Sequence, residues 1–166
     1  MRKYLPMISV FLLILSGCTR MIRVDADTYM QNQAFYEGKD ILIETNLANV
    51  LSQYTQYTDK NVELTAPVSS YRDWGMSGWY LILERDGKKL RCYEENYSYY
   101  LPWKALYLVR WARSEGGEVT ARGKVRKDGI ELCALTYKSL TVNTNAQMGG
   151  YEYPYSYSVP TGGHYR

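Results

Sequence analysis

The sequence predicts a mainly β fold, and three observations lead to this expectation. Apolar and polar side chains alternate over residues 62–68, which is the period of a strand with one buried face. Asp-Gly pairs at 86–87 and 128–129 stand between apolar runs, the strongest short-range signal of a β-hairpin. One helical stretch separates the two hairpins. Because the chain has 166 residues, of which 46% are hydrophobic, it can bury one core, and we expect one main domain.

The N-terminal residues have the pattern of a secretory signal. Arg2 and Lys3 precede an apolar run over residues 5–15, which is shorter than the roughly 20 residues that a membrane-spanning helix needs. The run ends in Leu15-Ser16-Gly17-Cys18. An ordinary N-terminal membrane anchor with a chance cysteine is the alternative interpretation, and the short run argues against it.

Charged start, apolar run and closing cysteine together resemble the signal peptide and lipobox of bacterial lipoproteins. The resemblance implies that residues 1–17 are a signal peptide and that the sulfur of Cys18 carries a diacylglycerol. Several acyl chains hold a protein stably on a bilayer, so the implied location is the cell envelope, on a membrane reached through Cys18. In such lipoproteins an Asp after the cysteine favours the inner membrane. Thr19 in this sequence therefore favours the outer membrane, facing the periplasm.

The charge balance weakens a nucleic-acid-binding interpretation. Without Arg2 and Lys3, the 20 basic residues fall to 18 against 17 acidic ones, a net charge of about +1. Nucleic-acid-binding surfaces need a basic excess that releases counterions from the phosphates. The 18 Tyr against 2 Phe indicate many half-buried or surface aromatic side chains.

Two segments are expected before the main domain. Residues 18–33 show no sustained period and predict a tether between membrane and domain. Residues 34–59 predict an extension with a short strand at 41–43 and an amphipathic helix over 46–57, for which Asn46 is the N-cap. The apolar face of that helix consists of Leu47, Val50, Leu51 and Tyr54.

The main domain is expected over residues 60–138. Its order of elements resembles the OB-fold, a small five-stranded Greek-key barrel with a helix between strands three and four. Gly-Lys-Val at 123–125 before a turn and Gly-Ile-Glu-Leu at 129–132 after it are similar to the last two strands of such domains. The five expected strands cover residues 62–71, 79–84, 89–93, 118–126 and 130–137, and the expected helix covers residues 104–114.

The resemblance implies a mainly β, five-stranded OB-like barrel, with a short helix before it and one between strands three and four. An open α+β sheet is the alternative, and residues 104–114 also fit strand alternation. Residues 139–166 are rich in Tyr, Gly and Pro, a composition that argues against a barrel strand and predicts an extended tail.

Catalytic patterns are missing from the sequence. The one histidine, His164, is the third residue from the end, where it is poorly placed for a Ser-His-Asp or Cys-His arrangement. The sequence contains neither a nucleophile elbow nor a phosphate loop, and the three cysteines lack zinc-site spacing. We therefore predict no enzymatic activity, no cofactor and no metal site.

Cys92 and Cys133 could form a disulfide in an oxidising compartment. Strand parity argues against it, because Cys92 shares a face with Leu90, whereas Cys133 alternates with Leu132 and Ala134. A bulge would be needed to bring the two sulfurs onto one face. Two buried free thiols are the alternative.

Basic and aromatic side chains mark a candidate ligand-binding face. Basic residues alternate on the fourth and third expected strands, and aromatic residues accompany the second and third, the strands along which OB barrels bind ligands. Ordinary solubilising strand faces are the alternative. The expected ligand-binding residues are Trp74, Tyr80, Lys89, Arg91, Tyr93, Arg122, Lys124 and Arg126.

These observations predict a lipid-anchored envelope lipoprotein that acts as a non-catalytic binding or structural module for an envelope protein or glycan. Two alternatives belong to other classes. One is a nucleic-acid-binding OB protein of a DNA-uptake or conjugation system, against which the small net charge argues. The other is a small envelope hydrolase, which would need convergent carboxylates.

Overall fold

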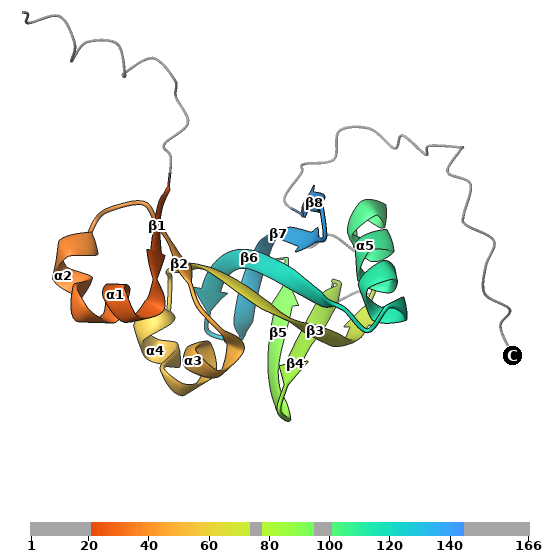
Figure 1. The fold of residues 1–166 in the computed structure, drawn as a ribbon, viewed down its shortest axis with the longest axis horizontal. Coiled ribbons are helices and arrows are strands. Elements are labelled where there is room, and N and C mark those ends of the chain that lie inside the picture. Colours follow the sequence, from red (N-terminus) through yellow and green to blue (C-terminus); the bar gives the residue numbers. More distant parts are fainter. Residues whose placement is uncertain (1–20, 74–77, 95–100, 145–166) are drawn as a thin grey trace, which may run out of the picture.

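The computed structural model describes residues 21–73, 78–94 and 101–144 (Figure 1). Of these residues, 47% are in strands and 28% in helices, so the fold is mainly β as expected. The strands are β1 Ile22–Asp25, β2 Ile41–Glu44, β3 Asn61–Arg72, β4 Tyr80–Arg85, β5 Lys88–Tyr93, β6 Glu118–Arg126, β7 Gly129–Tyr137 and β8 Leu140–Asn143. The helices are α1 Ala26–Gln31, α2 Gln33–Tyr36, α3 Leu47–Ser52, α4 Tyr54–Tyr57 and α5 Trp103–Ser114.

All eight strands belong to one sheet with the order β1-β2-β3-β4-β5-β7-β6, and β8 pairs with β7. An additional antiparallel pairing of β3 with β6 brings the strands from β3 to β7 into a partly closed ring. Strands β1, β2 and β3 are parallel, as are β5 and β7. The remaining pairs are antiparallel.

The two Asp-Gly hairpins predicted from the sequence are present. Asp86 and Gly87, with φ of 53° and 73°, form the tight turn between β4 and β5, and these positive values are why Asp and Gly stand there. Gly129 begins β7 with φ of 144°. A Cβ atom at Gly129 would collide with the carbonyl oxygen of Arg91, so the glycine permits the close parallel approach of β7 to β5.

Helices cover the two ends of the ring (Figure 1). Helix α5 contacts β3, β6, β7 and β8, and α3 contacts β3, β4 and β5 from the other side. The inward-facing side chains form one continuous apolar cluster. Its core includes Val50 of α3, Leu81 of β4, Leu108 of α5 and Leu132 of β7, all fully buried. Among the described residues, apolar side chains fill the inside of the ring, so the polar groups available to a ligand lie on its outside.

The segment predicted to be a tether is folded from Ile22 onward. Strand β1 pairs in parallel with β2, and the side chain of Asp25 caps α1 by accepting a hydrogen bond from the Thr28 amide at 2.9 Å. Val24 and Tyr29 are buried. Four strand residues are too few to show a period, and their partner lies about 20 positions later in the chain, so local patterning does not reveal this strand.

The predicted tail also begins inside the fold. Strand β8 pairs with β7, Val142 is buried, and the Thr144 hydroxyl donates to the Leu132 carbonyl at 2.8 Å. The tail residues 145–166 lie outside the described residues. The other expected elements are found close to their predicted bounds, except that the helix expected over 46–57 is interrupted at Gln53 into α3 and α4. Asn46 caps α3 as predicted, accepting from the Asn49 amide at 2.8 Å.

Candidate functional site

The hairpin β4–β5 has two chemically different faces. Leu81, Leu83 and Cys92 point inward and are fully buried. Tyr80 and Tyr93 point outward and are half-buried. This separation follows from the two-residue side-chain period of the strands. The antiparallel register places the two outward rings opposite each other as a Tyr80–Tyr93 pair.

Two arginines lie beside these rings. The guanidinium carbon of Arg91 is 4.8 Å from the ring centroid of Tyr80 and 5.7 Å from that of Tyr93. The guanidinium carbon of Arg72, on the neighbouring β3, is 5.2 Å from the Tyr80 centroid. All three distances are within the range of cation–π interactions. We call Arg72, Tyr80, Arg91 and Tyr93 the arginine–tyrosine ladder.

The arginine–tyrosine ladder combines two kinds of recognition. Phenol rings offer flat apolar faces with a polar edge, and a guanidinium group presents forked N–H donors that match a carboxylate or phosphate. Arg72 and Arg91 are exposed on the surface. A ligand with an apolar ring face and an anionic group would contact the phenol rings with the first and the guanidinium groups with the second.

Four of the residues expected at the binding face lie on the hairpin. Tyr80, Arg91 and Tyr93 come together as expected. Lys89 lies nearer the turn, where its ammonium is 3.5 Å from the Glu84 carboxylate, and it is not part of the ladder. Trp74 lies outside the described residues.

Arg72 was not singled out from the sequence, because the first strand of the main domain was expected to end before it. In the structure β3 continues through Arg72. The β3–β4 register shifts between Val68 and Ser70, and after this shift Arg72 lies on the exposed face of the strand. A long alternating strand that ends in a basic residue is the signal that could have identified it.

The basic stripe expected on β6 is engaged by carboxylates. Arg122 donates to Glu63 with Nη2 at 2.6 Å and Nε at 2.9 Å. Arg126 makes ion pairs with Asp59 at 2.6 Å and Glu131 at 2.7 Å. The stripe therefore lies on the outer face of β6, but both of its arginines are paired with carboxylates. The reason is the sheet register, which sets Glu63 of β3 directly opposite Arg122.

Lys124 lies between these arginines on β6, opposite Glu131 of β7 in the register. Within the described residues it makes no ion pair. A single lysine on a half-buried strand position is much less than the basic surface that phosphate binding needs.

Glu63 is the centre of a charge network that joins the first part of the chain to the ring. Besides Arg122, it accepts hydrogen bonds from Arg23 of β1, with both oxygens 3.1 Å from Nη2. Arg23 also donates to Glu44 of β2 at 2.5 Å. Only 16% of the Glu63 side chain is exposed. The network thus crosses four neighbouring strands, and such networks stabilise more than isolated surface pairs do.

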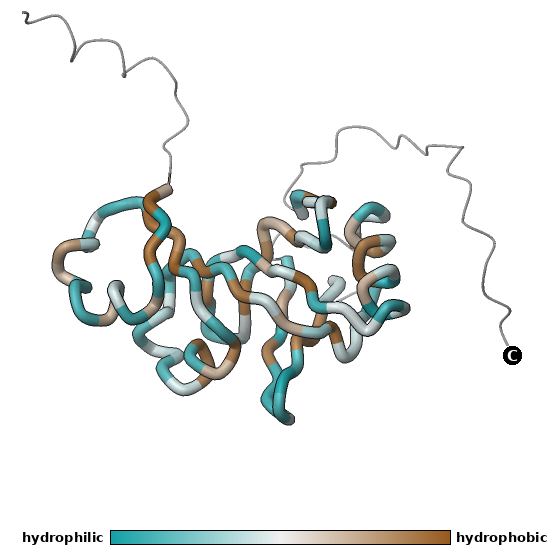
Figure 2. Tube along the Cα trace, viewed as in Figure 1, coloured by the Kyte–Doolittle hydropathy of each residue, from teal (hydrophilic) through white to brown (hydrophobic). Residues whose placement is uncertain are grey.

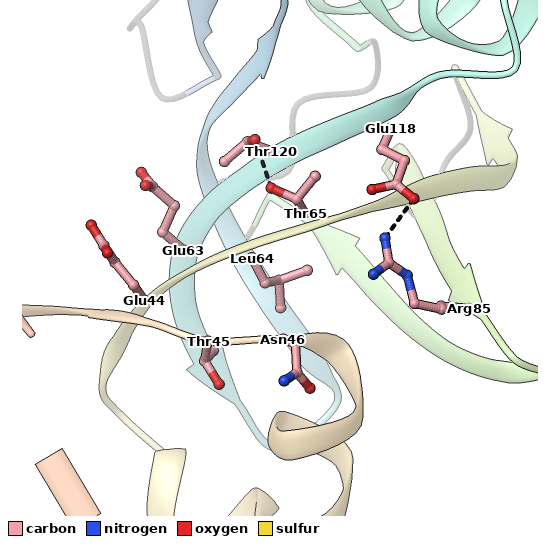
Figure 3. Close-up of a pocket in the computed structure, with 9 residues that line it drawn as sticks. All are labelled: Glu44, Thr45, Asn46, Glu63, Leu64, Thr65, Arg85, Glu118 and Thr120. Atoms are coloured by element: carbon pink, nitrogen blue, oxygen red, sulfur yellow. Dashed lines mark hydrogen bonds and ion pairs between the residues drawn. The ribbon is translucent and has the colours of Figure 1, made fainter. Parts of the chain in front are cut away.

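A shallow groove runs beside this network (Figure 3). It has a volume of about 420 Å³ and is lined by β2, β3 and β6 together with Arg85 of β4. The Thr65 and Thr120 hydroxyls join at 2.8 Å across it, and Arg85 is 2.5 Å from Glu118. Each of its three glutamates therefore has an arginine partner. No group of three or more potential metal ligands occurs among the described residues.

Both described cysteines are free thiols, so the possible disulfide, against which strand parity argues, is not formed. Cys92 pairs with Ile130 in the β5–β7 register, three residues before Cys133. That offset is roughly 10 Å along a strand, beyond the reach of a disulfide. Burial raises the pKa of the Cys92 thiol to about 12 and also raises the pKa of Cys133. The Cys133 thiol donates instead to the Arg122 carbonyl at 3.3 Å.

In the described part of the chain, none of the helices combines the length and the apolar character that crossing a bilayer requires. Cys18 and His164 lie outside that part. In comparisons with known proteins, no family model, curated protein or solved structure matches the chain.

Proposed function

We propose that the protein is a lipid-anchored, non-catalytic binding module of the bacterial cell envelope. In this proposal Cys18 carries the lipid in the outer membrane, the folded domain faces the periplasm, and the arginine–tyrosine ladder binds an envelope protein or glycan. The observation that carries the proposal is the ladder itself, in which the Arg91 guanidinium lies 4.8 Å from the Tyr80 ring centroid on the outer surface of β4–β5.

An OB-like description of the ring belongs to the same proposal. The strand order β3-β4-β5-β7-β6 with β6 returning to β3, the parallel β5–β7 pair and a helix between β5 and β6 support it. On that description β4 and β5 are strands two and three, along which OB domains bind their ligands. The ladder lies on these two strands, with Arg72 added from β3.

The chemistry of the ladder favours a glycan or protein over a nucleic acid. Arg122 and Arg126, which would extend a basic track around the ring, are ion-paired with carboxylates. Nucleic-acid affinity depends on releasing several counterions from phosphates. Two arginines beside two phenol rings suit stacking on a sugar or aromatic face, together with one acidic group.

Photo-crosslinking in intact cells tests the proposal. A benzophenone amino acid at position 80 abstracts hydrogen from the C–H bonds of a protein or a glycan, so either partner is captured. The matched control carries the same amino acid at Thr65, an exposed position on β3 beside the groove of Figure 3. We expect a discrete adduct from position 80 only, which disappears in the Arg91→Ala variant.

Adducts of equal yield from positions 80 and 65, or an adduct unaffected by Arg91→Ala, would contradict binding at the ladder. Anchoring is tested separately by Cys18→Ala, which should abolish fatty-acid labelling and release the protein from the membrane fraction. Tight DNA binding at physiological salt that is lost in the Arg91→Ala variant would replace the glycan or protein partner with a nucleic acid.

A further inference from the structure

The folded domain begins almost immediately after the proposed lipidation site. Ile22 is the first residue of β1, and its amide donates to the Asp40 carbonyl at 3.0 Å. Only Thr19 and Arg20 separate Cys18 from Met21. Three residues of extended chain span at most about 11 Å. A lipid on Cys18 would therefore hold the start of β1 close to the bilayer surface.

Three exposed apolar side chains belong to the first part of the described chain. Met21, Ile22 and Phe35 are 38%, 46% and 64% exposed. Phe35 belongs to α2, and the Lys39 ammonium lies 3.2 Å from its ring centroid. Lys39 immediately precedes Asp40, whose carbonyl accepts from the Ile22 amide, so the Lys39 side chain and backbone connect the Phe35 ring to the start of β1. We call Met21, Ile22 and Phe35 the N-terminal apolar face.

We infer that the N-terminal apolar face rests on the bilayer to which Cys18 is anchored, with Phe35 inserted at the boundary between headgroups and acyl chains. This inference depends on the proposed lipidation. Three partly exposed side chains bind a membrane weakly from solution. A short link, however, makes the contact intramolecular, at an effective concentration of the order of millimolar or more, so a weak contact is occupied most of the time.

The chemistry of this face favours lipid over an acidic or basic protein partner. Glu37, Lys39 and Asp40 lie within four positions of one another and are all exposed, so together they carry a net charge of only −1. An ammonium above an aromatic ring at a bilayer surface can reach the headgroups while the ring enters the apolar layer. The contact should therefore form on zwitterionic vesicles and tolerate salt.

The inferred contact fixes how the domain is oriented. The turn between β4 and β5 lies at the opposite side of the molecule from the start of β1 (Figure 1). Figure 2 shows that turn as hydrophilic and the start of β1 as hydrophobic. The domain would then stand on the membrane with the hairpin tip directed into the aqueous phase.

Depth-dependent quenching on vesicles tests the inference with the lipidated mature protein. In a Cys133→Ser background, a fluorophore is placed at Glu37→Cys, beside the face, or at Lys88→Cys, on the distant hairpin. The vesicles are phosphatidylcholine with a spin-labelled phosphatidylcholine quencher. We expect strong quenching at position 37 and none at position 88. Phe35→Ser should abolish the quenching at position 37, and Phe35→Trp should retain it.

Fatty-acid labelling of the same samples separates the inference from the proposal on which it rests. Labelled protein without quenching at position 37, or with equal quenching at positions 37 and 88, overturns the docked orientation and leaves the lipid anchor standing. Absence of fatty-acid label at Cys18 overturns both. Circular dichroism of Phe35→Ser controls for folding, and because Phe35 is largely exposed, its spectrum should match that of the parent.

Discussion

Two outer surfaces of the ring carry arginines on neighbouring strands, and they differ in what those arginines meet. On β4–β5, Arg91 lies against the rings of Tyr80 and Tyr93. On β3–β6, Arg122 is held by Glu63. In sequence both arginines alternate with inward-facing residues in the same way. The cross-strand partner therefore determines whether an arginine remains available to a ligand.

The two surfaces should also differ in how they contribute to stability. An arginine above a half-buried ring at the surface contributes about 0.5–1 kcal/mol, and a ligand can contact the ring or the guanidinium without breaking the sheet. Glu63 is mostly buried and accepts from two arginines. Removing a partner from such a group leaves charges unsatisfied, which destabilises the fold more than the loss of a cation–π contact does. The ladder suits recognition, and the network suits structural support.

The largest loss of stability is expected where β7 approaches β5. Gly129→Ala should destabilise the fold by about 3 kcal/mol, since its new methyl group would collide with the Arg91 carbonyl at a positive φ. Gly87→Ala is the matched control. It has positive φ but no atom within 4 Å of the added Cβ, and should lose about 1 kcal/mol. Urea unfolding of both variants measures the difference, and equal losses would show that the close approach is unimportant.

The next effect concerns the charge network. Glu63→Gln should lower the free energy of unfolding by about 2 kcal/mol, because Arg23 and Arg122 lose a shared carboxylate. Glu118→Gln removes the partner of Arg85 from a pair in which both side chains are over 40% exposed, and should change stability by less than about 1 kcal/mol. Thermal unfolding would refute the contrast if the two variants were equally stable.

A smaller effect comes from Cys92, which lies beneath the ladder. Its pKa is about 12 in the fold against an ordinary value of 9.0, so below pH 9 the thiol is protonated in both states and has no pH-dependent effect. Above pH 9 the unfolded chain releases the proton and stability falls. Between pH 8 and 10 the parent should lose about 1 kcal/mol more than Cys92→Ala. If the difference in free energy of unfolding between the parent and Cys92→Ala were the same at pH 8 and pH 10, the Cys92 thiol would not be buried as described.

The smallest change in stability is expected at the ladder itself. Arg91→Ala should alter the free energy of unfolding by less than about 1 kcal/mol, because it removes only exposed cation–π contacts. The same variant should lose the photo-adduct from position 80. A large loss of stability would instead assign Arg91 to the structural support of the sheet and remove the contrast with Arg122.

Local patterns predicted much of this fold. Alternation identified the strands around Val62 and Ile130, an Asp-Gly pair identified the turn at Asp86, and Asn46 was found as a helix cap. Each of these features depends on residues a few positions apart. The parallel strand β1 was not foreseen, because it exists only by pairing with β2 across an intervening pair of short helices.

The candidate site shows the same limit. Tyr80, Arg91 and Tyr93 were identified because they lie on one hairpin whose register follows from its turn. The engagement of Arg122 by Glu63 joins residues 59 positions apart, and no local period reports which carboxylate a distant strand will bring. The free state of Cys133 depends likewise on the β5–β7 register. Long-range register, more than secondary structure, limited the prediction of the candidate site.

The long strand β3 determines when the N-terminal strands can fold during synthesis of the chain. It pairs with β2 and β6 through its first residues and with β4 through its last. Strands β1 and β2 are synthesised before β3, and their fold depends on it and on the still later β6. Until then their edges are open to other chains, since unpaired edges invite aggregation. A chain truncated before Glu118 should therefore be degraded or aggregate, and should not yield a smaller folded domain.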